Sequence, residues 1–373
     1  MIGIMIFFII LIIAALLYYL LRDRQSVLIP LMFMLLVVLM GAVFDVPDYG
    51  PYERFFYFSQ YIDFENFDEE MAQYYYVSND QGYMMLNRIC FNLGMDYPEF
   101  RFLTTAISVM IISFVIFKMT HNIFLVLFLY LLYPFMMDVC QVRNFMGEVI
   151  LLLTLYLCSR NIKKSKIFFL GLMILASMLQ KTFIVYAFFV LLWYIRGVEK
   201  LRWIYRLLLI VGVLMPFYEG IIIGKYDDMI QIMQATSDQY NATTRGYLTG
   251  ETRLGYLVAY FKFIPMFIVI KYIRNKYNES GIKKQFINLV YLLHEYMFVI
   301  MPVIGITATA WRYPRNLLLP LYICCAIYLE RKTNNRFWFF IAVTSMAISI
   351  AAIESGGDFS VLWRILSNNY LWG

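Results

Sequence analysis

Asp138-Val-Cys-Gln-Val-Arg-Asn-Phe-Met-Gly-Glu148 is a short polar stretch between two apolar runs, residues 123–137 and 149–158. If the runs form a hairpin of two membrane helices, the basic residues beyond them are cytoplasmic and Arg143, at the tip, faces the other side. We expect an arginine on that side to bind an anionic substrate at the outer face of the membrane. The basic residues that flank the hairpin are Lys118, Arg160, Lys163, Lys164 and Lys166.

The composition of the whole chain is that of a membrane protein. Of its 373 residues, 62% are hydrophobic, 19% aromatic and 15% charged, and the mean hydropathy is +0.68. A soluble domain has no use for so much apolar surface, so the composition predicts an all-α, polytopic transmembrane helix bundle. The net charge of +6 comes from short basic clusters beside apolar runs, a pattern typical of cytoplasmic loops and not of nucleic-acid binding.

About twelve apolar runs are candidate spans of one transmembrane domain over residues 1–373. Several are shorter than the ~20 residues that cross the hydrocarbon, so one short pair could be re-entrant. The first run lacks a basic leader and a cleavage site, and we expect it to be retained as a span. The runs are residues 2–21, 27–44, 102–117, 123–137, 145–158, 167–179, 183–195, 207–223, 254–270, 286–310, 317–329 and 337–353.

The distribution of charge predicts that both termini are extracytoplasmic. In that orientation the inner loops hold most of the 31 Lys and Arg but few of the 25 Asp and Glu. Two long loops then lie outside: residues 45–101, acidic and aromatic, and residues 225–253, polar. Residues 83–93 have apolar side chains at helical spacing, which predicts an amphipathic helix at the membrane interface or an ordinary covering helix. Binding sites are usually built on such loops.

Phosphate is the ligand that the outer residues favour. Arginines outnumber lysines among these residues. Proteins use Arg more often than Lys where two parallel hydrogen bonds bind a phosphate. For most of them the ordinary interpretation is a headgroup contact or a pair with a nearby acid. Arg143, Arg312 and Arg315 stand out because they lie in tight tips bounded directly by spans. The outer arginines are Arg54, Arg88, Arg101, Arg143, Arg245, Arg253, Arg312, Arg315 and Arg364.

A carboxylate beside these arginines could act as a general base. Asp48 lies in Asp45-Val-Pro-Asp-Tyr-Gly-Pro-Tyr52, where two prolines are expected to fix a rigid extended turn just above the bilayer. A partly dehydrated carboxylate there would deprotonate a sugar hydroxyl. Asp138 and Glu148 are alternatives, although each fits equally well as a structural counter-ion of Arg143.

Motifs of other chemistries are missing from the sequence. No GxSxG, HExxH, P-loop or dinucleotide-binding pattern occurs, so a hydrolase, a zinc peptidase or a nucleotide-driven pump has no support. The five cysteines have no metal-ligand spacing and are predicted to be small buried hydrophobes. We therefore predict no cofactor and no metal.

The order of several short motifs resembles the EpsG-like family of bacterial membrane proteins, which is grouped with the Wzy polymerases of exopolysaccharide, capsule and O-antigen. One departure concerns the tip after residues 167–179, which reads Gln180-Lys181-Thr182 where the family often has His and a small hydroxyl residue. A base would then have to be one of the acids. Residue 144 is likewise Asn where the family often has Gln. The motifs are Asp48-Tyr49 with Tyr52, Gln81-Gly82-Tyr83 with Leu86 and Asn87, Arg143-Asn144, and Arg312-Tyr313.

The resemblance implies polymerisation of undecaprenyl-diphosphate-linked oligosaccharide repeat units by glycosyl transfer, at the outer face of the bacterial cytoplasmic membrane. Arg143, Arg312 and Arg315 would hold the leaving diphosphate, and Asp48 or Glu148 would take the hydroxyl proton. The expected partners are the lipid-linked oligosaccharide, the bilayer, and a flippase and chain-length regulator. Further substrate-binding candidates are Arg54, Arg88, Tyr49, Tyr52 and Lys181.

Four other functions are alternatives to polymerisation. A lipid-linked glycan flippase or transporter predicts polar residues through the span interiors and an internal repeat, and the sequence has neither. An O-antigen ligase shares the lipid diphosphate donor, so the sequence separates it poorly; a membrane acyltransferase is the other enzyme alternative. A scaffold role leaves the outward arginines unexplained.

Overall fold

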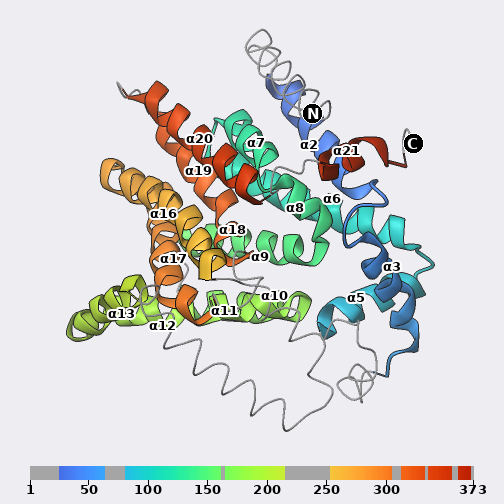
Figure 1. The fold of residues 1–373 in the computed structure, drawn as a ribbon, viewed down its shortest axis with the longest axis horizontal. Helices are drawn as coiled ribbons and strands as arrows, with labels where there is room; N and C mark the ends of the chain where they lie inside the picture. The colour runs from blue at the N-terminus through green and yellow to red at the C-terminus, as the bar shows by residue number, and fades with distance from the viewer. Residues whose placement is uncertain are drawn as a thin grey trace. The chain divides into compact units, whose positions relative to one another are not determined.

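The computed structural model of the chain describes residues 25–63, 80–160, 164–214, 253–304, 312–331, 335–354 and 360–370 (Figure 1). These residues are helical, and the β-structure among them is one isolated bridge between Val43 and Asn369. The expected first span, residues 2–21, lies outside the described residues. So do residues 64–79 of the first long loop and residues 225–252 of the second.

The chain forms two compact units. Met1–Ile184 and Tyr322–Gly373 make up the first, and Val185–Leu321 makes up the second. The single transmembrane domain expected over residues 1–373 stays a prediction, because each unit has its own set of internal contacts.

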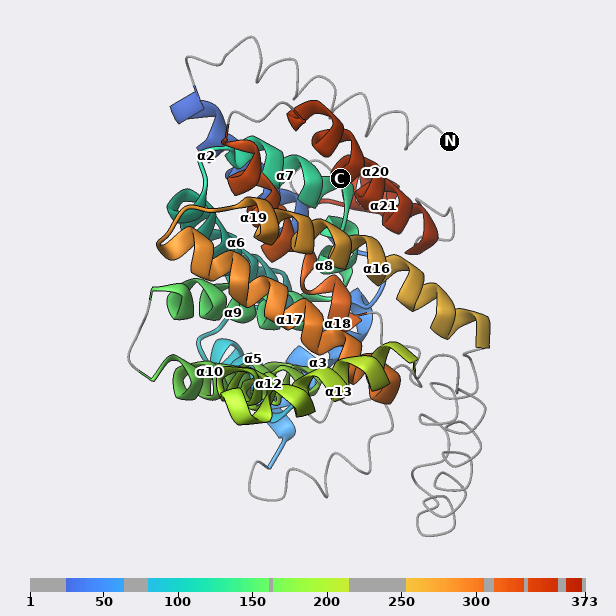
Figure 2. The same cartoon turned by 90° about the vertical axis from the view of Figure 1, so that its left-hand side faces the viewer.

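Long apolar helices form the centre of the first unit. α6 (Tyr97–Met119) packs against α2 (Gln25–Gly41) and α9 (Val142–Ser159), and α9 lies beside α10 (Ser165–Leu179) in Figure 1 and Figure 2. α6 begins at Tyr97, earlier than the expected residue 102. The reason is a capping box: the Glu99 N–H donates to the Asp96 carboxylate at 2.9 Å, and the Asp96 N–H donates to Glu99 at 3.1 Å.

The expected span over residues 123–137 is not one helix. α7 (Ile123–Leu132) ends before Pro134, and the short α8 (Phe135–Cys140) follows. Proline has no N–H to continue the helical hydrogen bonds and its ring clashes with the preceding turn. The prediction of a continuous span was therefore wrong, and the hairpin around Arg143 is a broken helix followed by α9.

The first long loop contains helices. α3 (Tyr49–Phe58) continues into η2 (Ser59–Tyr61), with Pro51 in its first turn. The expectation of a turn holds at Pro47, where the Tyr49 N–H donates to the Val46 carbonyl at 3.0 Å. It was wrong at Pro51, because proline is tolerated at the start of a helix, where the N–H has no partner anyway. The amphipathic helix expected at residues 83–93 is confirmed as α5 (Gln81–Asn92), which buries Tyr83, Met84 and Cys90. All five cysteines of the chain are buried, as predicted, and none forms a disulfide with another described residue.

The described helices account for some of the expected spans. Three are long and apolar enough to cross a membrane: α6, α9 and α20 (Arg336–Glu354). A fourth is added if Lys181–Gly197 and Glu199–Gly212, which bend by 107°, form one broken span. About twelve spans therefore remain a prediction.

The second unit is built on α17 (Ile282–Ile304). α16 (Arg253–Lys276), α12 (Phe189–Gly197) and α13 (Arg202–Leu214) pack against it. An ion pair of 2.6 Å between Arg196 and Glu295 joins α12 to α17, and the Tyr205 hydroxyl of α13 donates to the same carboxylate. The other helices in the described part of the chain are η3 (Lys181–Phe183), α11 (Ile184–Ala187), η4 (Glu199–Leu201), α18 (Arg312–Arg315), α19 (Leu318–Leu329) and α21 (Ser360–Ser367).

Gly147 allows close packing between α9 and the start of the segment after α10. A Cβ at residue 147 would overlap the fully buried ring of Phe183. We expect Gly147→Ala to lower the free energy of unfolding by about 1–3 kcal/mol, the usual cost of overpacking a core. Gly171→Ala on α10 is the matched control, because nothing lies within 4 Å of a Cβ there. It should be neutral or stabilise by up to about 1 kcal/mol through helix propensity. Thermal unfolding of the purified protein followed by circular dichroism tests this, and equal stability of the two variants would contradict it.

Candidate functional site

Arg143 lies at the start of α9 in the first unit, in an ion pair with Asp80. Its Nη1 donates to Asp80 Oδ2 at 2.6 Å, and the two side chains are 16% and 6% exposed. The pair is therefore largely buried but reaches solvent on the arginine side. A charge-assisted hydrogen bond of this length in a poorly hydrated place is among the stronger polar interactions in proteins.

Asp80 was not predicted to be a site residue. Besides Arg143, its other oxygen accepts a hydrogen bond of 2.7 Å from the backbone N–H of Lys181, at the end of α10. One carboxylate thus joins the start of α5, the start of α9 and the α10–η3 junction. A sequence signal was present: Asp80 directly precedes Gln81-Gly82-Tyr83, at the position where a helix-capping acid is common.

Three aromatic rings surround the Arg143 guanidinium. Its Cζ lies 5.0 Å from the centre of the Tyr52 ring and 5.5 Å from the rings of Phe55 and Tyr83. These distances allow cation–π attraction, which strengthens when the cation is poorly hydrated. Burial raises the pKa of Tyr83 well above its usual value, so the hydroxyl stays protonated and can donate a hydrogen bond.

The structure brings together some of the residues predicted from the sequence. Arg143 and Tyr52 are in contact, and Lys181 joins them through its backbone while its side chain is exposed. Tyr49 lies elsewhere: its hydroxyl shares a hydrogen bond of 3.1 Å with Tyr370, and its ring lies 5.7 Å from the Cζ of Arg101.

Other predicted residues do not contact Arg143 in the described part of the chain. Arg54 is exposed on α3. Arg88 donates to the Ile62 carbonyl at 2.9 Å, which ties α5 to the end of the α3–η2 segment. These positions favour structural roles, and substrate binding by Arg54 and Arg88 stays a prediction.

The three candidate acids have different surroundings. Asp48 is exposed and precedes α3 in the left-handed conformation (φ 65°). Glu148 is fully buried on α9, and Asp138 is buried and accepts from the Tyr130 hydroxyl at 3.0 Å. Among the described residues the ion-pair partner of Arg143 is Asp80, so the suggestion that Asp138 or Glu148 is its counter-ion is not supported.

Arg312 and Arg315 belong to the second unit, on the single turn α18. Arg315 is 1% exposed, whereas Arg312 is partly exposed. The Tyr313 carbonyl between them accepts a hydrogen bond of 2.7 Å from the Tyr186 hydroxyl, which holds the turn in place. That these two arginines act with Arg143 stays a prediction.

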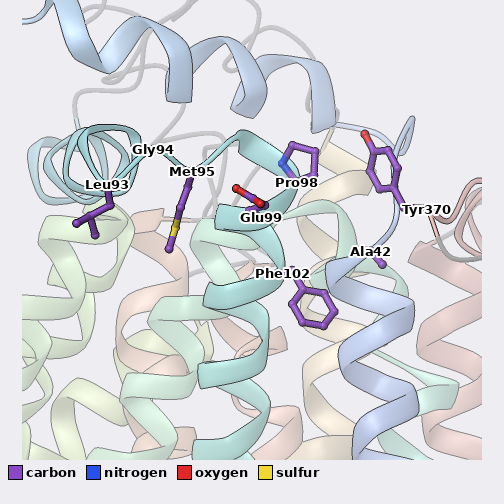
Figure 3. Close-up of a pocket in the computed structure, with 8 residues that line it drawn as sticks. All are labelled: Ala42, Leu93, Gly94, Met95, Pro98, Glu99, Phe102 and Tyr370. Carbon is purple, nitrogen blue, oxygen red and sulfur yellow. The ribbon is translucent and has the colours of Figure 1, made fainter.

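A pocket of about 630 Å³ opens in the first unit near the start of α6 (Figure 3). Its walls are mostly apolar, and Glu99 contributes the charged side chain. None of the predicted site residues lines it. Its lining residues are Ala42, Leu93, Gly94, Met95, Pro98, Glu99, Phe102 and Tyr370. Within the described segments no group of three or more His, Cys, Asp or Glu side chains is arranged to hold a metal ion.

Apolar helices around a buried, aromatic-lined arginine define a helical membrane protein with a candidate anion site. The chain belongs to the EpsG family, whose model matches residues 26–363. This is a family of Wzy-like polysaccharide polymerases. No curated protein and no solved structure matches the chain.

Removal of the Asp80 charge tests the ion pair. We expect Asp80→Asn to lower the free energy of unfolding by roughly 3 kcal/mol, because it leaves the largely buried Arg143 charge without this partner. Asn keeps an oxygen for the Lys181 N–H, so the charge is the main loss. Asp96→Asn is the control; Asn caps a helix as well as Asp, and we expect a change below about 0.5 kcal/mol.

A double variant separates the pair from a general loss of packing. Asp80→Asn with Arg143→Met removes both charges, and we expect it to be more stable than Asp80→Asn alone, with a coupling of about 1–3 kcal/mol. Denaturant or thermal unfolding of all variants in one detergent measures these differences. Strictly additive effects would show that the two side chains do not interact.

Proposed function

We propose that this protein polymerises lipid-linked oligosaccharide repeat units by glycosyl transfer at the outer face of the bacterial cytoplasmic membrane. The observation that carries the proposal is the Arg143 guanidinium, fixed by Asp80 and surrounded by Tyr52, Phe55 and Tyr83, in a member of a polysaccharide polymerase family. The donor is a growing glycan on undecaprenyl diphosphate, and a second lipid-linked unit supplies the acceptor hydroxyl.

The reaction breaks one bond and forms one. The acceptor oxygen attacks the anomeric carbon of the donor, the bond from that carbon to the diphosphate oxygen breaks, and the diphosphate leaves with the electron pair. A fixed guanidinium stabilises the charge that develops on this leaving group. Arg143 supplies this guanidinium in our proposal. Aromatic side chains of the first loop, such as Tyr52, contact sugar rings.

The proton of the acceptor hydroxyl goes to a carboxylate. Asp48 is our choice over Glu148, because Asp48 is exposed to an incoming substrate whereas Glu148 is fully buried. Asp48 also lies one helical turn before Tyr52, whose N–H donates to the Asp48 carbonyl at 3.1 Å. Asp48 thus immediately precedes α3, the helix whose Tyr52 contacts Arg143, and this position supports the choice.

Complementation of a polymerase-null strain tests the role of Arg143. We expect Arg143→Lys to lose about a hundredfold or more in polymer formation, because Lys cannot reproduce the planar, two-pronged contact with phosphate. Glycan length on a gel and the membrane level of the protein are read together. Arg160→Lys, at the exposed other end of α9, is the control and should leave long chains unchanged.

Three outcomes of that experiment have different meanings. Single lipid-linked units exposed outside the membrane, with normal expression, support polymerisation. Single units retained inside would show that the protein is a flippase and that the proposal is wrong. Long chains in Arg143→Lys would exclude Arg143 from the site.

Asp48→Asn tests the general base. General base catalysis contributes about 10²- to 10⁴-fold, so we expect polymerisation in membranes to slow by that factor. Asn adopts the left-handed conformation readily, so the backbone before α3 should be preserved. Asp45→Asn is matched, because Asp45 is also exposed with positive φ (51°), and it should keep normal activity. A full rate in Asp48→Asn would remove Asp48 from the mechanism.

A further inference from the structure

A second arginine is buried in the first unit, on α6. Arg101 is fully buried; its Nε donates to the Met40 carbonyl at 3.1 Å and its Nη2 to the Val139 carbonyl at 2.5 Å. Nη1 has no hydrogen-bond partner in the described part of the chain. The ion pairs among described residues do not include Arg101. The two carbonyls and the Tyr49 ring, which lies 5.7 Å from the Arg101 Cζ, carry no formal negative charge, so they do not neutralise the guanidinium.

Two tyrosine hydroxyls are likewise buried without a hydrogen-bond partner among the described residues. Tyr83 and Tyr97 are both fully buried, and neither hydroxyl has a hydrogen-bond partner among the residues described. A buried polar group left without a partner destabilises the folded state. Three such groups in one small part of a unit call for an explanation, and ligand binding is a usual one.

The three groups lie in one cluster. The rings of Tyr83 and Tyr97 both contact Phe100, with centroid distances of 6.1 and 6.3 Å. The Tyr83 hydroxyl is within electrostatic range of the Tyr97 hydroxyl and of both Arg101 and Arg143. Arg101 also acts electrostatically on the Tyr97 hydroxyl, although the two groups do not form a well-aligned hydrogen bond. The three groups are therefore near one another but do not form hydrogen bonds with one another.

Their chemistry selects a negatively charged oxygen. Nη1 of Arg101 can only donate, and the tyrosine hydroxyls stay protonated donors in this buried setting. Asp80 is paired to Arg143, and Glu53 of α3 acts electrostatically on the Tyr97 hydroxyl. Among the described residues, however, no carboxylate forms an ion pair with Arg101. Hydrogen-bond donors beside a buried guanidinium that has no carboxylate partner in the described part of the chain are what a phosphate oxygen requires.

We propose that Tyr83, Tyr97 and Arg101 form an inner oxyanion subsite that receives the second phosphate of a lipid diphosphate whose first phosphate is held at Arg143. This inference rests on the function proposed above. The ligand enters past Arg143, which contacts Tyr83 and whose side chain is 16% exposed to solvent. Tyr83 lies between the two subsites, because its ring contacts Arg143 and its hydroxyl belongs to the inner group.

Binding of two isoprenoid probes to the full-length protein in detergent tests the subsite. Farnesyl diphosphate carries both phosphates and farnesyl monophosphate carries one. We expect the wild type to prefer the diphosphate, and the double variant Tyr83→Phe/Tyr97→Phe to lose at least about tenfold of that preference, since two hydrogen bonds to a charged group are removed. Isothermal titration calorimetry gives both dissociation constants. Tyr156→Phe, at the far end of α9, is the control and should keep the preference.

Stability without ligand gives a second readout. A hydroxyl without a partner contributes nothing to the folded state, so the double variant should unfold at the same temperature as the wild type or higher. Tyr130→Phe should unfold at a lower temperature, because that hydroxyl donates to Asp138. A purely structural role for Tyr83 and Tyr97 predicts the reverse, a destabilised double variant with unchanged binding.

The outcomes separate this inference from the proposed function. If the wild type prefers the diphosphate and the double variant keeps that preference, the inner subsite is wrong and the proposed function stands. If Arg143→Met also fails to weaken either probe, Arg143 is not the outer subsite. If the wild type binds neither probe, the proposed function fails and the subsite fails with it.

Discussion

The Arg143–Asp80 ion pair is the interaction on which the candidate site depends. A guanidinium surrounded by aromatic rings loses most of its hydration, and at Arg143 a carboxylate offsets that loss. Asp80 does so at 2.6 Å and also accepts from the Lys181 N–H. Because both contacts use one carboxylate, the position of the guanidinium, the start of α5 and the end of α10 are set together. Tyr52 and Tyr83 then have a fixed cation to pack against.

Two arginines in the first unit differ in the groups that compensate their buried charge. Arg143 is paired with a carboxylate and partly exposed, whereas Arg101 is fully buried on the carbonyls of Met40 and Val139. Carbonyls supply hydrogen bonds but no net charge, so Arg101 holds helix ends together and keeps its positive potential. A site that must bind an anion benefits from one guanidinium that reaches solvent and one that does not. The second unit uses a comparable pair, Arg196 with Glu295, to join its own helices.

Much of the fold follows from local pattern. Apolar runs with basic ends predicted the helices, the spacing of residues 83–93 predicted α5, and the tip between two runs pointed to Arg143. These features depend on residues a few positions apart, so one sequence is enough to find them. The wrong predictions were also local. Pro51 was predicted to lie in a turn but lies in the first turn of α3, and Pro134 was predicted to lie within one helix but separates α7 from α8. Proline restricts the backbone in both settings, and the neighbours decide which setting applies.

The sequence by itself determined the class of the protein, many of its helical segments and the choice of Arg143 and Tyr52 as candidate site residues. The tertiary structure decided which partners they have: Asp80 for Arg143, Tyr370 for Tyr49, and the Met40 and Val139 carbonyls for Arg101. Periodicity reports which side of a helix is buried. It does not report which distant segment covers that side, and a charge can be buried only beside the particular groups that the folded chain brings to it.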